Sequence, residues 1–215
     1  MADSDLWPLI HRQRTAVADM LEGLSRAQWD EPSLCRGWQV RDVVAHMIAT
    51  GHTTPRSFLG GFAAAGFRFH TFSAKQVAQR RDQAPDELVG ELRETASLRK
   101  RPPGPPQTPL SEAVLHGADI ARALGIRQDV DEEAQVRVAD FYKNTQPLIG
   151  ARKRIAGLRL RSTDTDWQTG DGPEVVGPTM SLLLAMSGRA SALDDLTGAG
   201  VGELASRMPD APRAR

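Results

Sequence analysis

Residues 111–125 read SEAVLHGADIARALG, and this stretch guides the interpretation of the whole chain. It places the carboxylate of Glu112 four residues before the imidazole of His116. Residues four apart on an α-helix lie on the same face, so both side chains can point to one place. The pair alone does not establish a site, because an exposed glutamate beside a packed histidine would give the same sequence.

A second histidine favours a functional site. His46 lies within VRDVVAHMIA, residues 40–49, among apolar side chains where a merely solvated imidazole is not expected. Two such helices side by side would present two histidines and a glutamate, the usual protein share of a catalytic zinc site with one open position. Asp42, four residues before His46, and Asp119, three after His116, are candidates to orient the two rings, although exposed helical aspartates would look the same.

Composition indicates an ordinary globular protein. Of 215 residues, 40% are hydrophobic and 25% charged, enough to bury a sizeable core. The 27 basic and 27 acidic residues cancel, so neither nucleic acid nor a membrane is an expected partner. A single cysteine, Cys35, excludes an intramolecular disulfide and a cysteine-rich zinc cluster. With no signal-like segment and no long apolar run, we expect a cytoplasmic protein.

The spacing of apolar residues predicts four main helices in the first part of the chain. They span residues 6–24, a segment that starts near residue 39, residues 85–99, and residues 109–124. The proline-rich RPPGPPQTP, residues 101–109, cannot be helical throughout and connects the last two. With His46 on the second helix and Glu112 and His116 on the fourth, this arrangement predicts a four-helix bundle with a metal in its core.

Residues 57–72, SFLGGFAAAGFRFHTF, contain five of the six phenylalanines among glycines and alanines. The simpler interpretation is a core-facing helix and loop. The alternatives are an apolar wall or lid beside the metal, or the surface of a homodimer. His52 and His70 have no partner at ligand spacing, and we leave both out of the predicted site.

The pattern changes after residue 150. Residues 131–149 still have helical spacing, but Leu158 and Leu160 then alternate with arginines, and Gly170–Gly172 suggest a turn before a further apolar segment. We therefore predict a small antiparallel sheet covered by a helix over residues 178–188. The predicted domains are a helical bundle over 1–150, a small α+β module over 151–208, and a disordered tail over 209–215.

Three motifs resemble those of the mycothiol-dependent maleylpyruvate isomerase family, a branch of the DinB-like metal-binding four-helix bundles. They are GWQVRDVVAHM (residues 37–47), EAVLHGADIARALG (112–125) and RSTDTDWQTGDGPEVVGPTMSLLLAMSGR (161–189). The resemblance implies a mainly α fold, with a DinB-like bundle followed by a small α+β module. It also implies that His46, Glu112 and His116 bind a divalent metal, usually zinc. The expected cofactors are therefore Zn²⁺ and mycothiol.

The resemblance further implies a metal-dependent thiol transferase or isomerase. Mycothiol, a low-molecular-weight thiol, would bind the metal through its sulfur and attack a small electrophilic substrate. A hydrolase that uses metal-activated water, and a non-catalytic metal-binding or ligand-sensing protein, remain as alternatives. No catalytic residue is assigned: Cys35 is more simply a buried structural cysteine than the nucleophile. The substrate-facing arginines stay unranked among Arg36, Arg41, Arg56 and Arg68.

Overall fold

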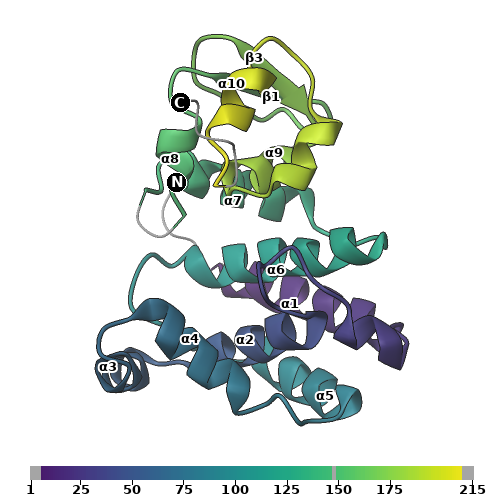
Figure 1. The fold of residues 1–215 in the computed structure, drawn as a ribbon, viewed down its shortest axis with the longest axis vertical. Helices are drawn as coiled ribbons and strands as arrows, with labels where there is room; N and C mark the ends of the chain where they lie inside the picture. Colours follow the sequence, from purple (N-terminus) through teal and green to yellow (C-terminus); the bar gives the residue numbers. More distant parts are fainter. Residues whose placement is uncertain (1–5, 147–148, 210–215) are drawn as a thin grey trace. The chain divides into compact units, whose positions relative to one another are not determined.

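A computed structural model describes residues 6–146 and 149–209 of the chain (Figure 1). The chain forms two compact units, Met1–Val130 and Asp131–Arg215. The helix Glu132–Tyr142, which lies within the predicted bundle domain 1–150, falls in the second unit, where it packs against the helix Thr179–Met186. Of the predicted disordered tail 209–215, all but Pro209 lies outside the described residues.

The first unit is helical. It contains α1 (Trp7–Glu22), the short 3-10 helix η1 (Arg26–Asp30), α2 (Val40–His52), α3 (Pro55–Ala64), α4 (Phe69–Ala78), α5 (Pro85–Ala96) and α6 (Thr108–Leu124). Helices α1 and α2 each pack against both α5 and α6, which gives the expected four-helix bundle (Figure 1). Its core is built from the apolar faces of these helices around Trp29, which is 1% exposed. The mainly helical fold class is therefore confirmed.

Local signals set the ends of the two helices that carry the predicted site. Helix α2 begins with a capping box, in which the backbone N–H of Gln39 donates to Asp42 Oδ2 over 3.1 Å. Helix α6 begins one residue earlier than expected, with Thr108 as its first residue and Pro109 as its second. It ends at Gly125, whose φ of 63° is a left-handed conformation that glycine adopts without strain.

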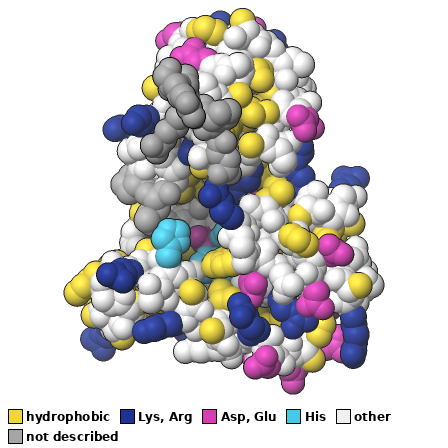
Figure 2. Space-filling view, viewed as in Figure 1, with side chains coloured by type: hydrophobic (Ala, Val, Ile, Leu, Met, Phe, Trp, Pro, Cys, Tyr) yellow, Lys and Arg dark blue, Asp and Glu magenta, His cyan; other side chains and the backbone are white. Residues whose placement is uncertain are grey.

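The phenylalanine-rich stretch forms two short helices, α3 and α4, where we expected one helix and a loop. The rings of Phe58, Phe62 and Phe72 pack on one another at centroid distances of 5.3 to 6.3 Å. Leu59 and Phe67 remain 62% and 73% exposed, and Figure 2 shows hydrophobic side chains beside basic ones at this corner of the first unit. The homodimer stays a prediction.

The second unit combines helices with a small sheet. Its elements are α7 (Glu132–Tyr142), α8 (Ala151–Arg154), β1 (Arg159–Ser162), β2 (Gln168–Thr169), β3 (Glu174–Gly177), α9 (Thr179–Met186), the 3-10 helix η2 (Ala190–Asp195) and α10 (Val201–Ser206). The strand order is β2-β1-β3, and α9 packs against both β1 and β3. Among the described residues, no helix has the length and apolar run needed to cross a membrane.

We expected an antiparallel sheet, but the sheet is mixed. Strand β2 is antiparallel to β1, but β3 runs parallel to β1 along its other edge. Between β2 and β3 the chain passes close to the start of β1. Gly170 and Gly172 have φ values of 76° and 129°, and a Cβ on either would collide with the carbonyl oxygen of Leu158 or Gly157. These two glycines allow the short return that the sequence pattern does not reveal.

The junction between the sheet and α9 is held by Asp164. Its Oδ1 accepts hydrogen bonds from the backbone N–H of Thr179 (2.8 Å), the hydroxyl of Thr179 (2.7 Å) and the hydroxyl of Ser162 (2.8 Å). Partial burial works against the charged form. The hydrogen bonds from Thr179 and Ser162 outweigh it and lower the pKa of the Asp164 carboxyl. A negative charge is therefore held at the N-terminus of α9, where the helix dipole favours it.

Replacing Asp164 by alanine should lower the free energy of unfolding at pH 7 by about 1–2 kcal/mol, the usual cost of a lost helix cap. Because the folded-state pKa is lowered, this stabilisation is present above the unfolded-state pKa of about 3.9 and is lost as the pH falls through the folded-state value. Urea denaturation at pH 7 and at acidic pH measures both effects. Asp166→Ala, an exposed neighbour, is the control; equal losses in the two variants would contradict the capping role.

Candidate metal centre

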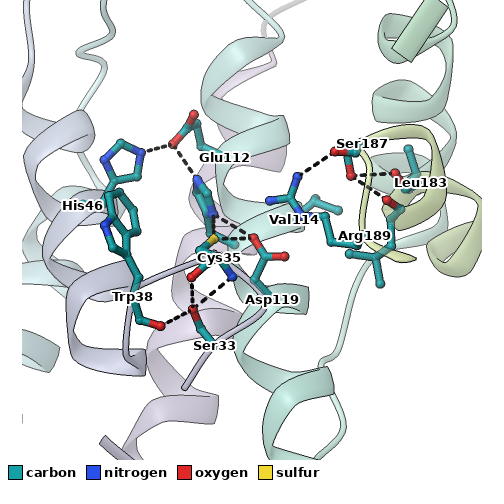
Figure 3. A network of polar contacts seen from close by, with 12 residues as sticks. Ser33, Cys35, Trp38, His46, Glu112, Val114, Asp119, Leu183, Ser187 and Arg189 are labelled. Atoms are coloured by element: carbon teal, nitrogen blue, oxygen red, sulfur yellow. Dashed lines mark hydrogen bonds and ion pairs between the residues drawn. The ribbon is translucent and has the colours of Figure 1, made fainter. Parts of the chain in front are cut away.

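Three side chains from two helices meet inside the first unit. Nε2 of His46, on α2, lies 3.2 Å from Glu112 Oε2, and Nε2 of His116 lies 3.4 Å from the same oxygen. All three atoms are within 4.8 Å of one another. Figure 3 shows His46 and Glu112 facing each other across the gap between their helices. The structure thus brings together the three predicted ligands, each of which offers one atom to a common point.

Their convergence follows from helix geometry and packing. Glu112 and His116 are four apart on α6 and form an i,i+4 pair. Helix α2 packs directly against α6, and His46 is only 6% exposed between them. The i,i+4 spacing was visible in the sequence, whereas the approach of His46 depends on the fold of the whole bundle.

His46 is held from its other side by α4. Its Nδ1 shares a 3.2 Å hydrogen bond with the hydroxyl of Ser73, which is 5% exposed, and the ring of Trp38 packs at a centroid distance of 5.1 Å. The expected partner, Asp42, is engaged elsewhere: Oδ2 caps α2 and Oδ1 lies 3.8 Å from Arg81. Asp42 caps its own helix and is therefore not available to the ring of His46, one turn later. Among the described contacts, Ser73 is the group that hydrogen-bonds to Nδ1 of His46, the role we expected for Asp42.

His116 is held by a different set of groups. Its Nδ1 lies 3.0 Å from Oδ2 of Asp119, whose side chain is fully buried. The same oxygen accepts the thiol of Cys35 at 3.0 Å, as the close view in Figure 3 shows. The loop that carries Cys35 is fixed to α6, since the backbone N–H of Leu34 donates to the carbonyl oxygen of Asp119. Cys35 is partly buried: it packs against the hydrophobic core, as expected of a structural cysteine, and its thiol also contacts the site.

Glu112 and His116 alter each other's protonation. Burial works against a charged imidazole, but the Glu112 carboxylate and hydrogen bonds with Asp119 and Cys35 raise the pKa of His116 well above its usual value. Burial likewise works against the Glu112 carboxylate, yet the charge of His116 and the close contacts with the rings of His116 and His46 hold its pKa well below the usual value. Such an ion pair is the arrangement that a divalent cation replaces when it displaces the proton.

The donor set and its spacing fit a divalent metal. Glu112 Oε2 is enclosed and, within the described part of the chain, has no hydrogen-bond partner of acceptable geometry. Two ligands of a tetrahedral zinc ion, each roughly 2.0–2.1 Å from the metal, are separated by about 3.3 Å. The two distances to Oε2, 3.2 and 3.4 Å, agree with that separation. Imidazole nitrogens and a carboxylate oxygen are also the ligand types that zinc prefers.

Cys35, His116 and Asp119 form a second group whose ligand atoms also lie within 4.8 Å of one another. This group uses the opposite nitrogen of the His116 ring. Its members already hydrogen-bond to each other, with Asp119 accepting from both neighbours. We therefore interpret it as support for His116.

Two other residues considered in the sequence lie outside this cluster. His70, which we left out of the predicted site, is exposed at the start of α4, and Arg41, one of the unranked arginines, pairs with Asp30 at 2.8 Å. Sequence reasoning missed two residues near the site, Ser73 and Arg14. Ser73 carries no local signal, but Arg14 is a charged residue on the buried stripe of α1, and that position could have identified it.

A comparison with protein families matches most of the first unit. The family described as the mycothiol maleylpyruvate isomerase N-terminal domain matches residues 10–121, a span that includes all three converging side chains. No curated protein matches the sequence.

Two crystal structures share the fold. One is described as a histidine-to-alanine mutant of the mycothiol-dependent maleylpyruvate isomerase (TM-score 0.61, 17% identity) and the other as that isomerase (TM-score 0.56, 15% identity). In both comparisons the match covers 96% of this chain and 94% of the other. At these identities the structures show the shared fold alone. Because the family match spans more than half of the chain, the protein belongs to the mycothiol maleylpyruvate isomerase family.

Proposed function

We propose that the protein is a metal-dependent thiol transferase or isomerase that uses mycothiol and acts on a small electrophilic substrate. Family membership supports the use of mycothiol. The observation that carries the proposal is the convergence of two imidazole nitrogens on one enclosed carboxylate oxygen at 3.2 and 3.4 Å. A bundle with a purely structural core has no need to enclose these three groups together.

In this proposal His46, Glu112 and His116 hold a divalent metal, and zinc is the ion that their chemistry fits best. The metal would supply a positive charge that favours the deprotonated form of a thiol. Three protein ligands leave room for one further group, as in other catalytic zinc sites.

The surrounding residues fix where the protons of the two histidines lie. Asp119, as a carboxylate, can only accept, so the Nδ1–H of His116 donates to it. The proton that a metal would displace is then the one on Nε2, the nitrogen that faces Glu112. Ser73 can accept in the same way from Nδ1–H of His46. Both rings then present Nε2 to the same point. The chain therefore orients its predicted ligands before a metal arrives.

Thermal unfolding measured in four conditions tests this proposal: chelated protein, zinc alone, mycothiol alone, and zinc with mycothiol. We expect zinc to raise the melting temperature and mycothiol to raise it further only when zinc is present, because a ligand stabilises the folded state that binds it. The His116→Ala variant should lose both shifts. Stabilisation by zinc with no further effect of mycothiol would contradict the thiol-dependent reaction and favour hydrolysis or a non-catalytic metal protein.

A further inference from the structure

The large apolar side chains that stay exposed in the described chain all lie on α3, on α4 or in the turn between them. They are Leu59 on α3 (62% exposed), Phe67 in the turn (73%) and Phe69 at the start of α4 (38%). None of the ten residues of α3 is buried. Apolar side chains that gather at one exposed place indicate a contact surface, whereas scattered ones do not. We call this surface, formed by residues 55–75, the α3–α4 corner.

Phe67 is held at the α3–α4 corner in a costly backbone conformation. Its φ is 57°, and among the described residues it alone has a positive φ without being a glycine. A bulky residue is strained in this left-handed region, whereas glycine is not. The ring packs edge-on against Phe62 at a centroid distance of 5.6 Å, yet most of its surface is open to solvent. Packing within the protein therefore gives little return for the strain, and a role in binding is the physical alternative.

The corner is also basic. The segment between Asp42 and Asp82 contains no acidic residue and five basic ones, although the 27 basic and 27 acidic residues of the whole chain balance. Two of the five face carboxylates, since Arg80 lies 2.9 Å from Glu91 and Arg81 lies 3.8 Å from Asp42. The other three are exposed and have no ion pair among the described contacts: Arg56, Arg68 and Lys75.

These three charges lie beside the exposed apolar side chains. Arg56 is three residues before Leu59 on α3, and Arg68 directly follows Phe67. Lys75 reaches across from α4, where its Nζ donates to the carbonyl oxygen of Ala64 at 3.2 Å. Figure 2 shows the resulting mixture of hydrophobic and basic surface. Large apolar groups and positive charge thus share one surface from which carboxylates are absent in sequence.

We propose that the α3–α4 corner docks onto an anionic phospholipid surface. Its exposed apolar side chains enter the boundary between headgroups and acyl chains, and its exposed basic side chains lie at the level of the phosphates. Peripheral binding of this kind combines buried apolar area with attraction of Lys and Arg to anionic lipid, and it needs no membrane-spanning helix. The balanced total charge gave no reason to expect it, because the acidic residues that balance the chain lie outside this segment.

Two other occupants fit the same surface less well. A second copy of the chain would bring basic side chains against basic side chains, and juxtaposed like charges oppose association. An acidic protein would match the charge, but it would also need a pocket shaped for the ring of Phe67. A fluid lipid interface accepts a projecting aromatic ring without such a pocket.

Co-sedimentation of the full chain with lipid vesicles tests the proposal. One kind of vesicle is pure phosphatidylcholine, and the other is an equal mixture of phosphatidylcholine and phosphatidylglycerol. We expect binding to the mixed vesicles, binding to pure phosphatidylcholine that is at least about tenfold weaker, and loss of binding as the salt concentration rises. Failure to bind the mixed vesicles, or equal binding to both kinds, would overturn the proposal. The result should be the same in zinc-loaded and in chelated protein, so the test does not depend on the metal site.

Phe67→Gly separates docking from folding. Glycine adopts the left-handed conformation without strain, so the melting temperature should be unchanged or higher. The affinity for the mixed vesicles should nevertheless fall about tenfold, because the apolar area of the ring is lost. An unchanged affinity in this variant would contradict insertion of the corner.

A pair of double variants tests the charges. Arg56→Gln with Arg68→Gln should weaken binding to the mixed vesicles at least about tenfold. Arg26→Gln with Arg127→Gln is the matched control, because it removes the same charge from exposed positions on η1 and after α6. It should bind as wild type does. Equal losses in the two double variants would show attraction by net charge alone and would reject the corner as the docking surface.

The same proteins distinguish the other occupants. Sedimentation velocity detects self-association, and fluorescence anisotropy of labelled poly-glutamate detects binding of an acidic polymer. Self-association that Phe67→Gly abolishes, without vesicle binding, would assign the corner to a second copy. Poly-glutamate bound as tightly as the mixed vesicles, with no effect of Phe67→Gly, would assign it to an acidic protein. Either result would overturn docking to lipid.

Discussion

Replacing His116 by alanine should lower zinc affinity by more than about a hundredfold, so that the purified variant contains no stoichiometric metal. The expected loss exceeds the 10- to 100-fold effect typical of residues that only support a metal ligand. It follows from the position of Nε2, which is 3.4 Å from Glu112 Oε2 and completes the set with His46. Elemental analysis and competition with a chromogenic chelator measure the change, and far-UV circular dichroism should remain helical.

Two further variants make this test specific. Glu112→Gln keeps the size of the side chain but removes its charge, and it should also lose zinc. His70→Ala removes an exposed histidine from α4 and should leave the metal content unchanged. Stoichiometric zinc in folded His116→Ala protein would reject the ligand assignment, and with it the proposed function.

The second large effect is expected at Asp119, whose replacement by asparagine should lower zinc affinity about 10- to 100-fold. The carboxylate accepts from both His116 Nδ1 and the Cys35 thiol within 3.0 Å and is completely buried. An amide of the same shape carries no charge and can present its NH₂ group to the ring, which disfavours the tautomer that offers Nε2 to a metal. Chelator competition at fixed pH measures the affinity.

Comparison with Ser73→Ala tests whether the charge of Asp119 matters. The hydroxyl of Ser73 supports His46 through one neutral hydrogen bond, so its removal should weaken zinc binding by a smaller factor. If Asp119→Asn bound zinc as tightly as wild type, orientation of His116 by Asp119 would be excluded, while the ligand set itself would stand.

Local sequence was enough to predict α2, α6 and the pairing of Glu112 with His116. Apolar spacing and end signals defined α2 and α6 to within a few residues, and the i,i+4 rule placed Glu112 and His116 on one face. The groups that hydrogen-bond to the two imidazole rings were harder to predict from local sequence. Ser73 is 27 residues from His46, and their contact depends on how α4 packs against α2. Asp42 had suitable spacing, but the capping of its own helix competed for its side chain.

The remaining differences have the same origin in contacts between distant segments. Alternation of apolar residues predicted strands but not that β3 would return parallel to β1. Helical spacing predicted α7 without showing that its partner is α9 of the second unit. The burial of Arg14 was also missed. In the sequence, a charged residue on an apolar stripe looks like an interruption of the stripe. The structure shows that the guanidinium donates to the carbonyl oxygens of Thr95 and Leu98.

Gly117, which directly follows His116, lies at a point where α6 is closely packed against its neighbours. A side chain at this position would run into Val17 of α1 and into Gln128, whose amide donates to the carbonyl oxygen of Val114 at 3.2 Å. The backbone of α6 is therefore wedged tightly just where it carries a predicted ligand. A rigid backbone at this point would let an ion of the right radius bind with little rearrangement and would weaken the binding of an ion that requires longer bonds. Selectivity between cations would then depend on the helix backbone as well as on the ligand atoms.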